Sequence, residues 1–172
     1  MVRHFIFILL LAAVGISNSA QAEDPLQNLP DPYVQPGPAM QARVGIHRLM
    51  AANLIDAIRL ASGQKKWNGI DFMLRTDALE SLAKMSYNFF VIPGSYAGTK
   101  AKPSILENIN DFKAKTFVTE TAAMGLAQNS RMHDPKGSMN AVGNLIQSCN
   151  ACHAEYMEPP LLLPLPPKPK PQ

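Results

Sequence analysis

The sequence of 172 residues contains only two cysteines, and they stand close together, as Cys149 and Cys152. A disulfide between residues this near in the chain closes a very small loop. It therefore removes little entropy from the unfolded chain and is a poor structural staple. We expect this pair of thiols to serve another purpose.

Charge of one sign is not in large excess either. The chain has 16 basic and 13 acidic residues, and its net charge is +3. No basic stripe with interleaved aromatic residues is present, although nucleic-acid-binding proteins typically carry one. Nucleic acid is therefore excluded as an expected partner.

Long apolar runs are absent except for residues 5–16, which are too few to span a bilayer comfortably. The short basic start Arg3-His4 precedes this run, and Ala20-Gln21-Ala22 follows it with the small residues of a cleavage site. The pattern predicts a signal peptide, 1–22, cleaved after Ala22, and a periplasmic protein with no stable membrane span after cleavage. The alternative is an uncleaved membrane anchor.

Proline is rare in the middle of the chain and dense at both ends. Of the 15 prolines, only Pro93, Pro103 and Pro135 fall between residues 39 and 158. Because proline breaks helices, we expect a Pro-rich N-terminal segment at 23–38, a helical domain at 39–158 and a Pro-rich tail at 159–172. Extended or disordered chain is the default for both flanks.

Apolar residues in the central domain recur every three or four positions, and none alternate with period two over any length. This pattern predicts helices at about 40–61, 70–90 and 103–126, a polar connection at 129–137, and a fourth helix that carries Val142 to Tyr156. Gly63 is a plausible C-terminal cap for the first of them. Four helices of about twenty residues are each about 30 Å long. The fold expected is all-α, an antiparallel four-helix bundle.

The motif Cys149-Asn150-Ala151-Cys152-His153 is C-x-x-C-H, the attachment signature of c-type haem. On a helix, the two thiols lie at i and i+3 and the histidine lies one turn after the first thiol. The thiols can bond two carbons on one edge of the porphyrin, and the imidazole can reach the iron beneath it. The sequence therefore predicts one covalently bound haem c near the end of the fourth helix, with His153 as an axial ligand.

Three other uses of the thiols remain open at this point. A thioredoxin-like redox pair needs a βαβ setting, which the helical pattern does not offer. A zinc site needs more ligands, and only His47 and His133 remain outside the motif after the signal peptide is removed. The last alternative is a plain disulfide followed by an incidental histidine.

The chain resembles the class II c-type cytochromes, the family of cytochrome c prime and cytochrome c-556. The resemblance covers about residues 40–157. It rests on the haem motif with 142–148 (VGNLIQS) before it, and on a loop with 90–95 (FVIPGS) and 99–103 (TKAKP), followed by 109–112 (INDF).

In the first helix, Arg43 followed by Leu49-Met50 matches the family's arginine and its apolar pair. The resemblance implies that the residue four positions after this arginine faces the distal side of the haem, and here it is His47. We expect His47 to be the second axial ligand, with Met50 or no distal ligand as the alternatives. Arg43 is expected either to pair with a haem propionate or to be a surface residue. Met157 stands where the family commonly has an arginine near the proximal histidine. This chain therefore departs from the family's proximal pocket.

The function expected is one-electron transfer by a six-coordinate haem, so the chain is an electron carrier and not an enzyme. The first alternative is a five-coordinate cytochrome c prime-like protein that binds nitric oxide or carbon monoxide. The second is an accessory module whose tail docks on a redox complex. Periplasmic redox proteins are the partners expected, and the resemblance makes a homodimer plausible.

The tail carries an apolar stretch, 161–165, which is unusual for a solvated chain end. A Pro-rich segment loses little entropy on docking because it is already extended. The tail is therefore expected either to lie in a groove, on its own bundle or on a partner, or to be a disordered end.

Overall fold

Four long helices make up most of the computed structural model, which describes residues 35–132 and 134–166. They are α1 (Pro36–Ala61), α2 (Gly69–Ser86), α4 (Ile109–Arg131) and α5 (Pro135–Tyr156), and the short elements are η1 (Tyr87–Phe89) and α3 (Ser104–Glu107). No strand occurs in these residues apart from an isolated antiparallel bridge between Ala101 and Met157. The predicted all-α class is confirmed.

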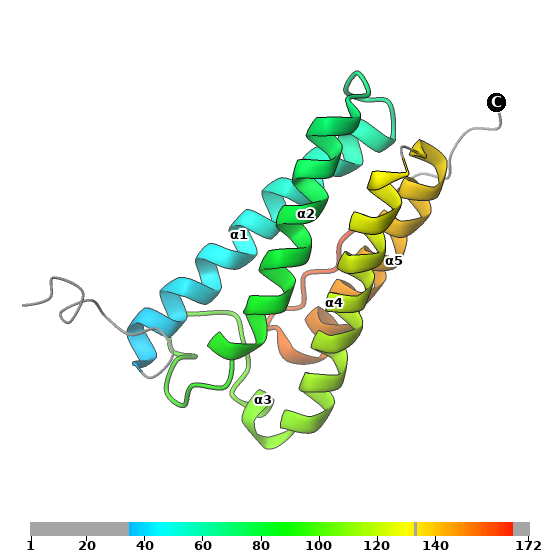
Figure 1. Ribbon diagram of the computed structural model, residues 1–172. Coiled ribbons are helices and arrows are strands. Elements are labelled where there is room, and N and C mark those ends of the chain that lie inside the picture. Colours follow the sequence, from blue (N-terminus) through cyan, green and yellow to red (C-terminus); the bar gives the residue numbers. More distant parts are fainter. Residues whose placement is uncertain (1–34, 133, 167–172) are drawn as a thin grey trace, which may run out of the picture.

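The long helices form an antiparallel bundle in which each helix packs on the next one along the chain (Figure 1). α1 contacts α2, α2 contacts α4, and α4 contacts α5, while the contact between α1 and α5 is much smaller. The seam between the first and last helices is therefore the most open side of the bundle. Within the described chain, no helix is both long and apolar enough to cross a bilayer.

The helix boundaries depart from the predicted ones where proline was interpreted as a break. α1 begins at Pro36, inside the segment expected to be extended, and α5 begins at Pro135, inside the stretch 129–137 expected to be a polar connection. Proline fits the first turn of a helix, where its missing N–H costs nothing. The predicted third helix is divided at Asn108, whose backbone (φ −117°, ψ 39°) separates α3 from α4.

The connection between α1 and α2 has a cap on each side. Gly63 has a φ of +77°, and its N–H bonds the carbonyl of Leu60, which confirms its predicted place just after the helix. On the other side, the Asn68 side chain accepts hydrogen bonds from the N–H groups of Ile70 and Asp71, each at 3.1 Å. These caps fix the turn that makes α1 and α2 antiparallel neighbours.

The bundle has two apolar clusters of buried residues. The larger cluster fills the space between the long helices, and its largest members are Leu54, Leu60, Phe72, Leu79, Leu126, Val142, Leu145 and Ile146. The smaller cluster lies near the end of α5 and consists of Tyr96, Ile105, Phe112 and Tyr156. Full burial of a Leu, Ile or Phe side chain contributes about 1.5–3 kcal/mol, so these clusters provide most of the favourable energy of the fold.

The connecting loop 90–103 ties the end of α5 to the rest of the bundle. Its Lys102 N–H donates to the carbonyl of Tyr156 at 2.9 Å, and its Lys100 carbonyl accepts from the N–H of Glu158 at 2.8 Å. The chain is therefore held by backbone bonds directly after the haem motif, and the position of α5's last turn is fixed.

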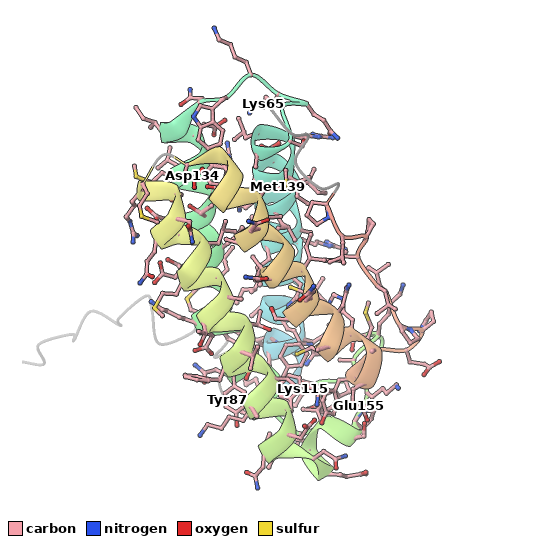
Figure 2. The ribbon with its side chains drawn as sticks, turned by 90° about the vertical axis from the view of Figure 1, so that its right-hand side faces the viewer. Lys65, Tyr87, Lys115, Asp134, Met139 and Glu155 are labelled. Carbon is pink, nitrogen blue, oxygen red and sulfur yellow. The ribbon has the colours of Figure 1, made fainter. Side chains whose placement is uncertain are left out.

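After α5, the chain turns and runs back beside this helix as far as Pro166 (Figures 1 and 2). Leu163 packs against the larger apolar cluster. Residues 159–166 thus lie on their own bundle, which confirms the docked form of the tail for this segment and not the disordered one. Residues 167–172, the predicted signal peptide (1–22), and 23–34 of the Pro-rich N-terminal segment lie outside the described residues.

Candidate haem site

The three residues of the motif lie on the last two turns of α5 and face one cavity. Cys149, Cys152 and His153 line a space of about 550 Å³, within the range of about 300–1,000 Å³ typical of cofactor pockets. α1 forms the opposite wall of this cavity with Val44, His47, Ala51 and Leu54. The cavity therefore lies along the seam between the first and last helices.

Both cysteines are free thiols and both are half-buried. Burial raises the pKa of Cys149 to about 11, and it also raises the pKa of Cys152. A thioredoxin-type pair needs the opposite shift, because its reactive thiol must ionise near neutral pH. The surroundings of these thiols therefore argue against a redox pair, in agreement with the absence of a βαβ unit from the residues described.

The zinc alternative finds no support in the geometry. No group of three or more His, Cys, Asp or Glu side chains able to hold a metal ion occurs within 35–132 and 134–166. His133, which the zinc alternative would need, lies outside the described residues. The remaining donors, two thiols and one imidazole one helical turn apart, suit the edge of a porphyrin and its iron.

His153 is held in one tautomer by the tail. Its Nδ1 lies 2.8 Å from the carbonyl oxygen of Leu161. Because a carbonyl only accepts, Nδ1 carries the proton and Nε2 keeps the lone pair that an iron ligand needs. The ring is thus oriented for ligation by a contact within the same chain.

His47 is fixed in the same way on the opposite wall. Its Nδ1–H donates to the carbonyl of Arg43 at 2.9 Å, one turn earlier in α1, and its ring packs edge-on against Phe90 with 5.4 Å between ring centroids. Burial is the main cause of its lowered pKa; the hydrogen bond to Arg43 opposes this shift, and the charges of His153 and Arg43 add to it. His47 is therefore a neutral imidazole whose Nε2 lone pair is available on the cavity side of α1. Met50 also lines the cavity, so the structure keeps both distal candidates on the same wall.

Arg43 is neither a surface residue nor free to extend from the helix. It is 3% exposed, which makes the surface interpretation wrong. Its Nη1 donates to the Phe89 carbonyl at 3.2 Å and the Ser95 hydroxyl at 3.1 Å, and its Nη2 donates to the Ser95 carbonyl at 2.6 Å and the Thr99 hydroxyl at 3.1 Å. The guanidinium thus anchors the connecting loop to α1. A contact with a haem propionate stays a prediction.

Two aromatic rings complete the surroundings of Arg43. Its guanidinium carbon lies 5.0 Å from the centre of the Phe90 ring and 5.3 Å from that of Tyr96. Burial lowers the pKa of Arg43, and the nearby Tyr96 opposes that shift. Carbonyl dipoles and ring faces therefore replace the carboxylate that usually accompanies a buried arginine.

Replacing Arg43 with methionine should destabilise the bundle by about 3 kcal/mol, because four hydrogen bonds from a charged donor are lost and two carbonyls are left buried without it. Urea unfolding followed by circular dichroism measures the change. Arg59→Met is the matched control, since Arg59 is an exposed arginine of the same helix with only a 3.8 Å ion pair to Asp56. Equal losses in the two variants would contradict this anchoring role.

Sequence reasoning missed two residues that hold the tail against the motif. Asn150 lies inside C-x-x-C-H and forms two hydrogen bonds to the backbone of Leu163, and Leu161 supplies the acceptor for His153. The apolar stretch 161–165 was a signal that the tail docks. No signal in the sequence identified the residue to which it docks, because the variable positions of the motif carry no pattern.

Comparison with known proteins identifies the family. A family model described as Cytochrome C′ matches residues 38–157. Cytochrome c-556 of Agrobacterium fabrum is 26% identical over 117 residues, which cover 68% of this chain and 79% of that protein.

Solved structures give the same result for the fold. Cytochrome c prime from Shewanella frigidimarina superposes with a TM-score of 0.67 at 26% identity, covering 72% of this chain and 96% of that one. The nitric oxide complex of a variant of cytochrome c prime from Alcaligenes xylosoxidans superposes with a TM-score of 0.66 at 24% identity, with 72% and 96% coverage. The helical bundle, the cavity at its seam and the family match agree: this chain belongs to the cytochrome c′ family of haem proteins and binds haem c covalently.

Proposed function

We propose that the chain carries single electrons between periplasmic redox proteins, with His153 and His47 as the two axial ligands of its haem iron. The observation that carries the proposal is the neutral His47 on the wall opposite the motif, with its Nδ1–H bonded to the Arg43 carbonyl. Members of the family are typically periplasmic, and the predicted signal peptide fits export.

The residues of the cavity suit this role. Cys149 and Cys152 hold the porphyrin edge, and when bound the haem supplies a one-electron redox couple. His153 and His47 each donate the Nδ1 proton to a backbone carbonyl, so the Nε2 lone pair of each would be free to bind the iron. Two protein ligands leave no position for substrate, so the site changes oxidation state with little rearrangement. Two histidines also favour a lower potential than a histidine and a methionine.

The apolar wall supports the same proposal. Leu54, Leu79, Leu145 and Phe112 line the cavity and are buried. They would keep water from the porphyrin faces. Electrostatic interactions between the haem and fixed protein dipoles are stronger where water is excluded. The accessory role for the tail stays a prediction only for residues 167–172, because 159–166 pack on their own bundle.

Gas binding is the second candidate. A variant of cytochrome c prime from Alcaligenes xylosoxidans, which has a similar fold, has been solved as a nitric oxide complex. Under this candidate, His47 does not ligate, or it is displaced by the gas. Met157 in place of the family's proximal arginine argues against a copy of that proximal pocket here.

Absorption spectra of the oxidised and reduced protein, with and without carbon monoxide, separate the two candidates. Electron transfer through a six-coordinate iron predicts split low-spin bands in the reduced form and no change on adding carbon monoxide. A broad high-spin Soret band that sharpens and shifts with carbon monoxide would instead establish the gas-binding alternative. The measurement uses the whole protein with its haem attached.

A further inference from the structure

The returning tail makes three hydrogen bonds with the last turns of α5, two to Asn150 and one to His153. The Leu163 N–H donates to Asn150 Oδ1 at 2.7 Å, and Asn150 Nδ2 donates to the Leu163 carbonyl at 2.9 Å. Two residues earlier, the Leu161 carbonyl accepts from His153 Nδ1 at 2.8 Å. One amide side chain thus holds both polar groups of one tail residue, and this fixes the register of the segment.

Apolar contacts hold the same segment. Leu163 packs against the larger core cluster, and both Leu161 and Leu163 line the cavity that also contains the motif. Pro166 reaches Gly143 of α5, where a Cβ on the glycine would lie 4.0 Å from the proline ring. The tail is therefore seated over more than two turns of α5, and its prolines reduce the entropy lost on docking.

The contact to His153 has a chemical consequence. A ligating histidine whose second nitrogen donates to a carbonyl is a more basic ligand, and its ring is held in one orientation. A more basic ligand stabilises the ferric iron relative to the ferrous iron and lowers the midpoint potential. Here the acceptor comes from a segment that follows the helical domain, on the side where Met157 stands in place of the arginine that the family commonly has.

We propose that residues 159–166 form a clamp on the proximal ligand: Asn150 fixes Leu163, and this places the Leu161 carbonyl to orient His153 and lower the potential of the haem. Asn150 and Leu161 are positioning residues, because they act through His153. The inference depends on His153 as a ligand and not on His47, so a high-spin spectrum of the wild type would leave it standing.

The test compares two truncations of the full chain, both isolated with haem attached. Ending the chain after Glu158 removes the clamp, while ending it after Pro166 removes only 167–172 and is the control. The first truncation should raise the midpoint potential, and the second should leave it at the wild-type value. In ferrous protein with five-coordinate iron, the Fe–His stretching frequency in resonance Raman spectra should fall for the first truncation only. It is measured in the wild type, or in a His47→Leu background if the wild type is six-coordinate.

A point variant keeps the test decisive if the shorter truncation fails to fold. Asn150→Leu removes both bonds to Leu163 and leaves every tail residue in place, whereas Asn144→Leu changes an exposed asparagine of the same helix. The first should shift the potential and the Fe–His frequency in the same directions as the truncation, and the second should not. A lowered melting temperature with unchanged potential and frequency would make the tail a structural element only and would overturn the proposal.

Discussion

Replacing Cys149 and Cys152 together with serine is expected to abolish covalent attachment of the haem completely. These are the only cysteines in the chain, so no other thiol can form a thioether. Denatured wild-type protein should keep its haem through extraction with acidic organic solvent, and the double variant should lose it. Each single variant keeps one thioether, and its pyridine haemochrome band should lie between those of c-type and unattached haem.

The double variant should also be much less stable. Without the haem, the apolar side chains that line the cavity of about 550 Å³ lose the group that fills it, and packing along the seam is lost. We expect a lower melting temperature and a broader transition in differential scanning calorimetry. Ser148→Ala is the control: it removes a hydroxyl that bonds the Leu145 carbonyl and lies beside Cys149 but leaves both thiols in place, and attachment should continue. Free extraction of haem from the wild type would refute the assignment of the thiols.

Replacing His47 with leucine should convert the iron from low spin to high spin and open it to carbon monoxide. Leucine removes Nε2, the only atom of this side chain that can reach iron while Nδ1 is held by the Arg43 carbonyl. The reduced protein should lose its split bands and gain a carbon monoxide spectrum that the wild type lacks. The midpoint potential should change as well, since an axial ligand is lost.

Met50→Leu is the matched control for this variant, because Met50 lines the same wall of the cavity one turn further along α1. If His47 is the ligand, Met50→Leu keeps the low-spin spectrum. Conversion by Met50→Leu and not by His47→Leu would assign the distal position to methionine. A wild type that is already high spin would exclude both residues.

The four-helix fold could be predicted because its signals are local. Three prolines in 120 residues and an apolar period of three to four set the number and order of the long helices. The helix ends were less predictable, because a proline is compatible both with the end of one helix and with the first turn of the next. Pro36 and Pro135 both took the second role. The break between α3 and α4 at Asn108 was not predictable, because no proline or glycine stands there.

The site divides in the same way. The C-x-x-C-H motif can be recognised directly in the sequence, and the spacing of apolar residues in α1 places His47 on the stripe that faces the bundle interior. The tautomer of His47 could not be predicted, because its Nδ1–H donates to a backbone carbonyl. Every residue has such a carbonyl, so no sequence pattern identifies the acceptor. The role of Arg43 was not predictable because its four acceptors lie 46–56 positions away, in a loop whose path only the folded chain defines. The pairing of Asn150 with Leu163 is hidden for the same reason.

The sparse seam between α1 and α5 sets an order of events in time. Every other pair of packed long helices is consecutive along the chain, so those pairs can form early and at small loop-closure cost. The seam joins the first helix to the last, and His47 and Cys149 are about a hundred positions apart in the chain. We therefore expect the wall that carries the cysteines to form before the wall that carries His47 closes against it. Under this order, both thiols would be accessible to a haem before the seam closes, and closure would seal a site already joined to its cofactor.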